Sequence, residues 1–164
     1  MKYNKEILDN IDIINQALIL LERETLFFNK DFKLNKDINS KDWIKLSLHK
    51  INRVPICLEI TSGEIRIDID RAEEVICISH NFIKENKENI IKLIVMILSS
   101  FIKVKYCGKG YTKIFFLDKN NKVLDAIEHY KNILFSLKLK CKEHIYMPIY
   151  PRGIESKHRG QLPP

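Results

Sequence analysis

The chain has 164 residues, of which 45% are hydrophobic and 30% charged, with only five glycines and five prolines. This composition excludes a disordered chain, and the length allows one domain with a core that needs no cross-links. The net charge of +7 is uneven: residues 1–100 hold 15 basic and 16 acidic side chains, whereas residues 101–164 hold 13 and five. This local excess indicates either an anionic partner or an ordinary lysine-rich surface.

The cysteines are scattered and form no Cys-x-x-Cys pair, and the first 15 residues lack the uninterrupted apolar segment of a secretory signal. The longest apolar run, Ile90 to Ile102, is shorter than the roughly 20 residues that a membrane span needs. We therefore expect a cytoplasmic protein with no membrane segment. Its four cysteines are expected to be free, mostly buried thiols in a reducing compartment.

The first elements follow from apolar spacing. A 3.6-residue period predicts a helix over residues 5–22, with Asn4 as its N-cap. Residues 26–34 are aromatic-rich without a clean period, which indicates a loop with a short extended piece. Ser40 then precedes a second predicted helix over residues 41–51, which ends before Pro55. Its apolar residues are Trp43, Ile44, Leu46, Leu48 and Ile51.

The most regular stretch runs from Pro55 to Lys105. Strict alternation of isoleucine and leucine with polar residues predicts a hairpin over residues 56–69, with its turn at Ser62-Gly63. Residues 75–78 are expected to add a third strand. The apolar residues between Ile90 and Ile102 then predict a long helix that is covered on more than one side.

A second hairpin is predicted from residues 104–106 and 111–117, with glycines 108 and 110 in its turn. Four-three spacing favours a helix over residues 123–139, and the rival is a strand over residues 122–130 that extends the hairpin. Beyond His144 the chain is expected to be extended. The predicted architecture is one α+β domain over residues 1–150, in which a small antiparallel sheet of two hairpins packs against several α-helices, followed by a mobile tail, 151–164.

One candidate site is the polar face of the first hairpin. Glu64, Arg66, Asp68 and Asp70 alternate along one strand, and Glu59 lies across from them. Carboxylates in this arrangement can hold a hard cation such as Mg²⁺, as a metal-dependent nuclease or hydrolase requires. The alternative is the solvent face of a sheet with cross-strand ion pairs, and alternation alone is enough to explain it.

A second candidate is the basic hairpin, which places Lys103, Lys105, Lys109 and Lys113 beside two tyrosines. Lysines beside aromatic rings suit phosphate contact and base stacking, and they suit an acidic protein surface equally well. The glycines here do not have the spacing of a phosphate-binding loop.

Two Cys-x-x-His spacings, Cys77/His80 and Cys141/His144, could supply four zinc ligands. They lie 64 positions apart without knuckle glycines, so chance spacing is the preferred interpretation. No nucleophile motif is present. We therefore expect no catalytic residue, no metal and no cofactor.

The order of hairpin, helix and hairpin, with the segments SGEIRIDIDRAEEV and YTKIFFLDKNNKV, resembles that of bacterial immunity proteins, which neutralise polymorphic or contact-dependent toxins. The resemblance implies a non-catalytic protein that occludes a toxin's active or docking site. The faces available for binding a toxin are Glu59, Glu64, Arg66, Asp68 and Asp70, and the hairpin with Lys103, Lys105, Lys109 and Lys113. This chain departs from the family in being basic, because immunity proteins against basic nucleases are often acidic. The alternatives are a nucleic-acid-binding accessory protein and a metal-dependent hydrolase.

Overall fold

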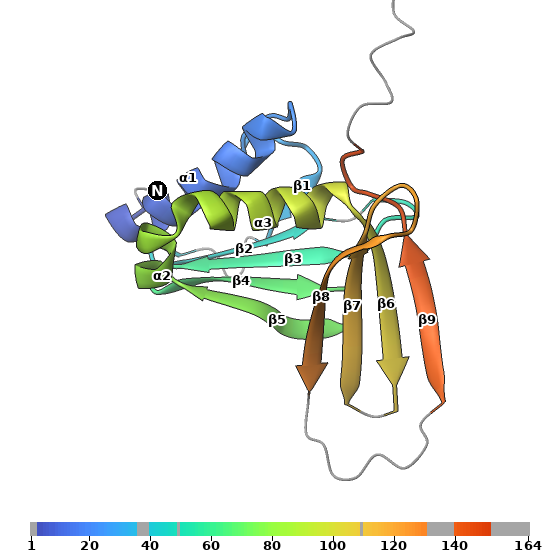
Figure 1. The fold of residues 1–164 in the computed structure, drawn as a ribbon. Coiled ribbons are helices and arrows are strands. Elements are labelled where there is room, and N and C mark those ends of the chain that lie inside the picture. The colour runs from blue at the N-terminus through green and yellow to red at the C-terminus, as the bar shows by residue number, and fades with distance from the viewer. Residues whose placement is uncertain (1–2, 36–39, 49, 109, 131–139, 152–164) are drawn as a thin grey trace, which may run out of the picture.

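The computed structural model describes residues 3–35, 40–48, 50–108, 110–130 and 140–151. These residues form two antiparallel sheets with the strand orders β1-β2-β3-β4-β5 and β8-β7-β6-β9. The helices lie along one face of the first sheet, and the strands of the second sheet run crosswise beside it (Figure 1). The elements are α1 Lys5–Leu20, β1 Phe32–Leu34, β2 Trp43–Leu48, β3 Ile56–Thr61, β4 Glu64–Ile69, β5 Ala72–Ser79, α2 His80–Glu85, α3 Lys87–Ser99, β6 Phe101–Cys107, β7 Tyr111–Leu117, β8 Val123–Tyr130 and β9 Cys141–Tyr146.

The fold is dominated by strands, so the predicted fold class was wrong. We expected one small sheet of two hairpins against several helices, whereas the two hairpins belong to separate sheets of five and four strands. The error arose at two segments that had been predicted as helices.

The first of these segments is β2, where residues 41–51 had been predicted as a helix. In the strand, Ile44, Leu46 and Leu48 are buried and the residues between them point to the opposite face. This two-residue period pairs β2 with the whole of β3, from Trp43 opposite Thr61 to Leu48 opposite Ile56. The helix prediction counted these apolar residues without weighing their strict alternation.

The second segment is β8, where a helix over residues 123–139 had been favoured. Residues 123–130 instead pair with β7, as in the rival interpretation, and residues 131–139 lie outside the described part of the chain. Asp118 shapes the preceding turn, because its carboxylate accepts the backbone N–H groups of Asn120 and Lys122. β8 is an edge strand with mostly exposed side chains, so its spacing carries no burial signal.

The other two predicted helices are present, but the second ends at Ser99, and Ile102, which had been counted in it, lies on β6. Asn4 caps α1 by accepting the N–H of Ile7 at 3.0 Å, and α1 buries the stripe that includes Ile7, Ile14 and Leu18. α3 buries six apolar residues, and both helices pack on the inner side of the first sheet. No helix in the described residues is long and apolar enough to span a membrane.

The expectation of four free cysteines is wrong for two of them. Cys107 on β6 and Cys141 on β9 lie directly opposite one another and form a disulfide. Of the other two, Cys57 is half-buried and Cys77 is exposed, whereas mostly buried thiols were expected.

The C-terminal part of the described chain is anchored at Tyr150. Its side chain is 1% exposed, and its hydroxyl donates to the Asp31 carboxylate at 3.0 Å and accepts from the Asn29 amide. Arg23 and Lys50 place their cationic groups over its ring at 5.0 and 4.6 Å. Of the predicted tail, residues 152–164 lie outside the described part of the chain.

Candidate functional site

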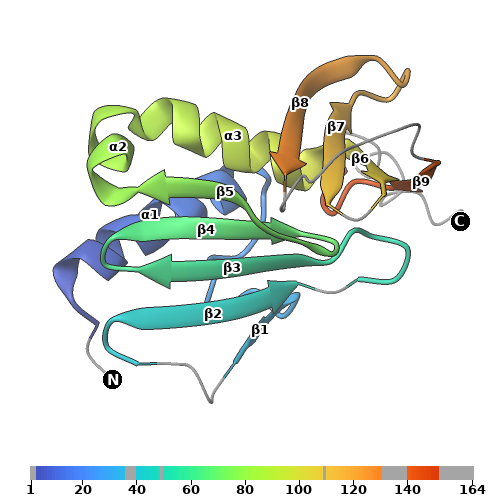
Figure 2. The same cartoon turned by 90° about the horizontal axis from the view of Figure 1, so that it is seen from below.

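The first sheet leaves one face uncovered by the described elements. Residues at alternate positions on β2, β3 and β4 point away from α1 and α3, and Figure 2 looks onto this side. We call it the open face; it comprises Trp43, Lys45, Cys57, Glu59, Glu64, Arg66 and Asp68. Four of the predicted site residues, Glu59, Glu64, Arg66 and Asp68, therefore lie together as the alternation indicated.

Ion pairs organise the open face. The strand register places Lys45 opposite Glu59 and Glu59 opposite Arg66, in a row across three strands. Lys45 forms a salt bridge with Glu59, and Arg66 forms one with Glu64 at 2.5 Å. The hydrogen bond to Glu59 raises the pKa of Lys45 above its ordinary value. Opposite charges in a cross-strand row stabilise a sheet, and they also present a fixed charge pattern to a partner.

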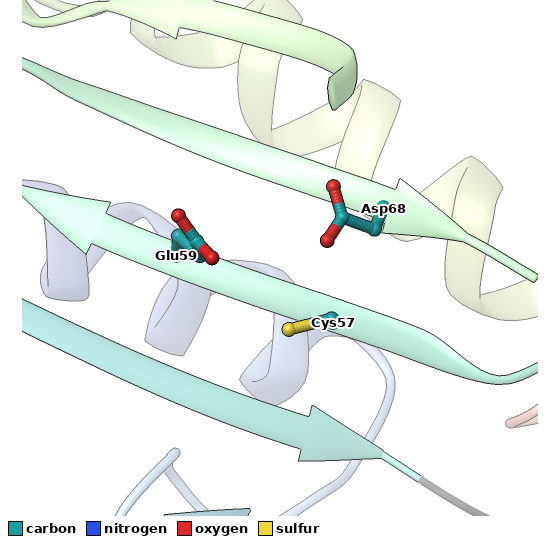
Figure 3. Close-up of side chains that lie close together, drawn as sticks. All are labelled: Cys57, Glu59 and Asp68. Atoms are coloured by element: carbon teal, nitrogen blue, oxygen red, sulfur yellow. The ribbon is translucent and has the colours of Figure 1, made fainter. Parts of the chain in front are cut away.

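Cys57, Glu59 and Asp68 form the tightest cluster on this face. Their ligand atoms lie within 4.8 Å of one another, with the first two on β3 and Asp68 on β4 (Figure 3). Burial raises the pKa of the Cys57 thiol, whereas metal binding and nucleophilic attack both need the thiolate. Glu59 already neutralises Lys45. A cation would have to displace both the thiol proton and the ammonium group, so the cluster is not a preformed metal site.

Asp70, the fifth predicted residue of this group, has a different position. It lies in the β4–β5 turn with φ at 57°, and its carboxylate accepts the hydroxyls of Tyr106 at 2.6 Å and Tyr146 at 3.0 Å. Both tyrosines belong to the second sheet. Burial and the hydrogen bond to Asp70 raise the pKa of both tyrosines above the ordinary value. Asp70 therefore joins the two sheets and is not part of the open face.

A pocket of about 240 Å³ lies between the open face and this junction, and Cys57, Asp68 and Asp70 are among its lining residues. Small-molecule sites usually measure about 300–1,000 Å³ and enclose most of their ligand. The pocket at this end of the open face is therefore smaller than most small-molecule sites.

The predicted basic hairpin is largely neutralised by acidic side chains on its two neighbouring strands. Glu143 of β9 pairs with Lys103 at 2.7 Å and with Lys105 at 3.2 Å, and Glu128 of β8 pairs with Lys113 at 2.5 Å. Lys109 lies outside the described residues.

The net positive charge of the chain lies mostly outside the described residues. The sequence outside the described ranges contains eight of the 28 basic and two of the 21 acidic residues, so the described residues carry a net charge of only +1.

The four residues considered for zinc do not form one site. Cys141 is bonded to Cys107 in the second sheet, whereas Cys77 belongs to β5 of the first. His80 is 8% exposed and directs Nδ1 to the Asn10 side-chain oxygen at 2.9 Å. The Asn10 amide nitrogen donates to the Thr61 carbonyl, so the Asn10 side-chain oxygen is the atom that faces His80. Because this oxygen can only accept, His80 carries a proton on Nδ1 and donates it.

The sequence interpretation missed Trp43, Lys45 and Cys57. The first two were assigned to a helix, and the third, which alternates with the core residues of the predicted hairpin, was not counted among the site residues. Trp43 is 39% exposed on the open face, opposite Thr61. The alternation in WIKLSL was the signal that could have placed Trp43 and Lys45 on one face of a strand.

Comparisons with known proteins provide no relative: no family model, no curated protein and no solved structure matches the chain.

Proposed function

We propose that this chain is a non-catalytic binding protein that recognises another protein through the open face of its first sheet. The observation that carries the proposal is the juxtaposition on one uncovered sheet face of a half-exposed tryptophan, Trp43, an arginine, Arg66, and a row of fixed charges. Tryptophan and arginine are enriched among the residues that contribute most to protein–protein affinity.

The charge of the face favours a basic partner surface. Glu59, Glu64 and Asp68 outnumber Lys45 and Arg66, and the two salt bridges hold several of these groups in place. Groups fixed before binding lose little side-chain entropy when the partner arrives. This local acidity reconciles a net basic chain with a basic partner.

The class of partner that we propose is a bacterial toxin, in line with the resemblance to immunity proteins. The mechanism is stoichiometric occlusion: the open face covers the toxin's active or docking site, and no bond is made or broken. The alternative of nucleic-acid binding receives less support, because Glu128 and Glu143 already pair with three of the lysines on which it depends. The alternative of a metal-dependent hydrolase receives less support. A metal ion would compete with Lys45 for Glu59 and with a proton for the Cys57 sulfur.

The test is protection of growth. The product of the gene adjacent to that of this chain is expressed in a bacterial host with and without this chain, and growth is measured. We expect the adjacent product to be toxic and the wild-type chain to restore growth. A Trp43→Ala/Arg66→Glu variant should fail to protect. Normal growth without the chain, or equal protection by the variant, contradicts the proposal.

The matched control is Tyr130→Ala/Lys119→Glu. It removes an aromatic ring at Tyr130 on β8 and reverses a positive charge at Lys119 in the β7–β8 turn. Both residues are exposed. We expect this control to protect as well as the wild type. Far-UV circular dichroism of both variants checks that each remains folded.

A further inference from the structure

Strand β9 is the edge of the second sheet and is held mainly by its attachments to β6. It pairs with β6 from Ile102 opposite Tyr146 to Cys107 opposite Cys141. Residues 141–145 are exposed, and Tyr146 is half-buried. Little apolar surface is therefore buried by this strand, and a segment with few buried contacts has a low local stability.

The non-covalent side-chain contacts of β9 lie near the surface, and they include ring contacts of His144 with Tyr106 and Tyr146. Glu143 pairs with Lys103 and Lys105 near the surface, where ion pairs contribute little. The Tyr146 hydroxyl bonds to Asp70 at one end of the strand. The disulfide lies at the other end, and it closes a loop between positions 34 residues apart.

The two cysteines of the disulfide differ in their exposure to solvent. Cys107 is 5% exposed, whereas Cys141 is exposed at the start of the edge strand. An incoming thiolate can therefore approach the Cys141 sulfur from solvent. Exposed disulfides are the labile members of their class.

We propose that the Cys107–Cys141 disulfide is a redox-controlled cross-link. While it is intact, β9 stays paired with β6, and its reduction by a dithiol releases β9. One reductant thiolate attacks Sγ of Cys141; a mixed disulfide forms, the Cys107–Cys141 bond breaks, and the departing Cys107 thiolate takes up a proton. The second thiolate of the reductant then attacks its own sulfur in the mixed disulfide, and Cys141 leaves and is protonated. Two electrons and two protons thus pass to the cysteines, and the reductant becomes a disulfide.

Release of β9 changes two features of the molecule. Glu143 moves away from Lys103 and Lys105, so the outer face of the second sheet becomes more positive. Asp70 loses Tyr146 but keeps Tyr106 on β6, so the two sheets stay joined.

The test is hydrogen–deuterium exchange of the wild-type protein with and without dithiothreitol. The Cα atoms of Cys107 and Cys141 are 4.2 Å apart, the close spacing of an antiparallel pair that exchanges no backbone hydrogen bonds. The amides bonded to β6 are therefore those of Lys142, His144 and Tyr146. We expect at least tenfold faster exchange at these amides after reduction, with the amides of β3 and β4 unchanged.

Two variants complete the test. Cys107→Ser/Cys141→Ser should exchange rapidly in β9 without reductant and show no further response to it. Cys77→Ser, at an exposed position on β5, should behave as the wild type does. Three results would overturn the proposal: unchanged β9 exchange after reduction, faster exchange throughout both sheets, or titration of four free thiols in the folded, air-oxidised protein.

Discussion

The two sheets are stabilised in different ways. In the first sheet, β2, β3 and β4 each bury every second residue under α1 and α3, so the hydrophobic effect holds the strands in register. In the second sheet, β8 and β9 are mostly exposed and are held by backbone pairing, a disulfide and surface ion pairs. The open face is therefore presented by strands with a buried core beneath them, whereas the edge strands of the second sheet can change without loss of that core.

The largest effect is expected from a truncation in the first core. Ile60 is 0% exposed on β3, and Ile60→Ala should lower the free energy of unfolding by about 2–5 kcal/mol through lost burial and the cavity left behind. The matched control is Ile145→Ala on β9, where the side chain is 62% exposed and the change should stay within about 0.5 kcal/mol. Chemical denaturation measures both, and equal losses would remove the contrast between the sheets.

The next effect concerns a buried polar link between α1 and the first sheet. Asn10 is 0% exposed and bonds to both the Thr61 carbonyl and His80. Asn10→Ala leaves these two groups without their partner and should cost about 1–3 kcal/mol of stability. Gln16→Ala, on the same helix, removes an exposed bond to Asp12 and should have almost no effect. A similar loss for both variants in thermal and chemical denaturation would show that burial of this amide is unimportant.

The junction between the sheets makes a prediction at alkaline pH. The pKa values of Tyr106 and Tyr146 are higher in the folded protein than in the unfolded chain, where they are about 10. The protonated hydroxyls therefore stabilise the fold fully below about pH 10. This stabilisation is lost as the pH rises through the pKa values of the folded protein. Absorbance at 295 nm should show that these tyrosines ionise at higher pH in the folded protein than in the denatured protein. Asp70→Asn should make both ionise at lower pH, because the hydrogen bond to a carboxylate is lost.

Tyr130 provides the control for that titration. Its hydrogen bond to Glu128 raises its pKa to about 12. Glu128→Gln should lower the pKa of Tyr130 and leave the junction tyrosines unchanged. If Asp70→Asn leaves all tyrosine ionisations where they were, the carboxylate does not control the junction.

The smallest effect is expected from a surface ion pair of the second sheet. Lys113 and Glu128 face solvent on β7 and β8, so replacing both with alanine should shift the denaturation midpoint much less than Ile60→Ala or Asn10→Ala does. Any shift should disappear in 1 M salt, because screening removes the attraction between exposed charges. A large, salt-independent loss would show that edge-strand charges stabilise the second sheet more than this comparison allows.

The sequence was most informative where burial and period coincide. The alternation of the first hairpin predicted β3, β4 and the gathering of Glu59, Arg66 and Asp68 on one face, and the apolar stripe predicted α1. Prediction failed at β8, whose exposed residues give no burial signal, and at β2, where apolar content was weighed above alternation. The pairing of Cys107 with Cys141 and the attachment of Asp70 to two tyrosines depend on contacts distant in sequence. No local pattern carries that information.

The central proposal is that the open face binds a protein partner. Its most direct test is the dissociation constant, measured by calorimetry, of this chain with the product of the adjacent gene. The wild type should bind, Trp43→Ala should weaken binding tenfold or more, and Tyr130→Ala should change it less than about twofold. Absence of wild-type binding, or a greater loss with Tyr130→Ala than with Trp43→Ala, would contradict the assignment of the open face as the recognition surface.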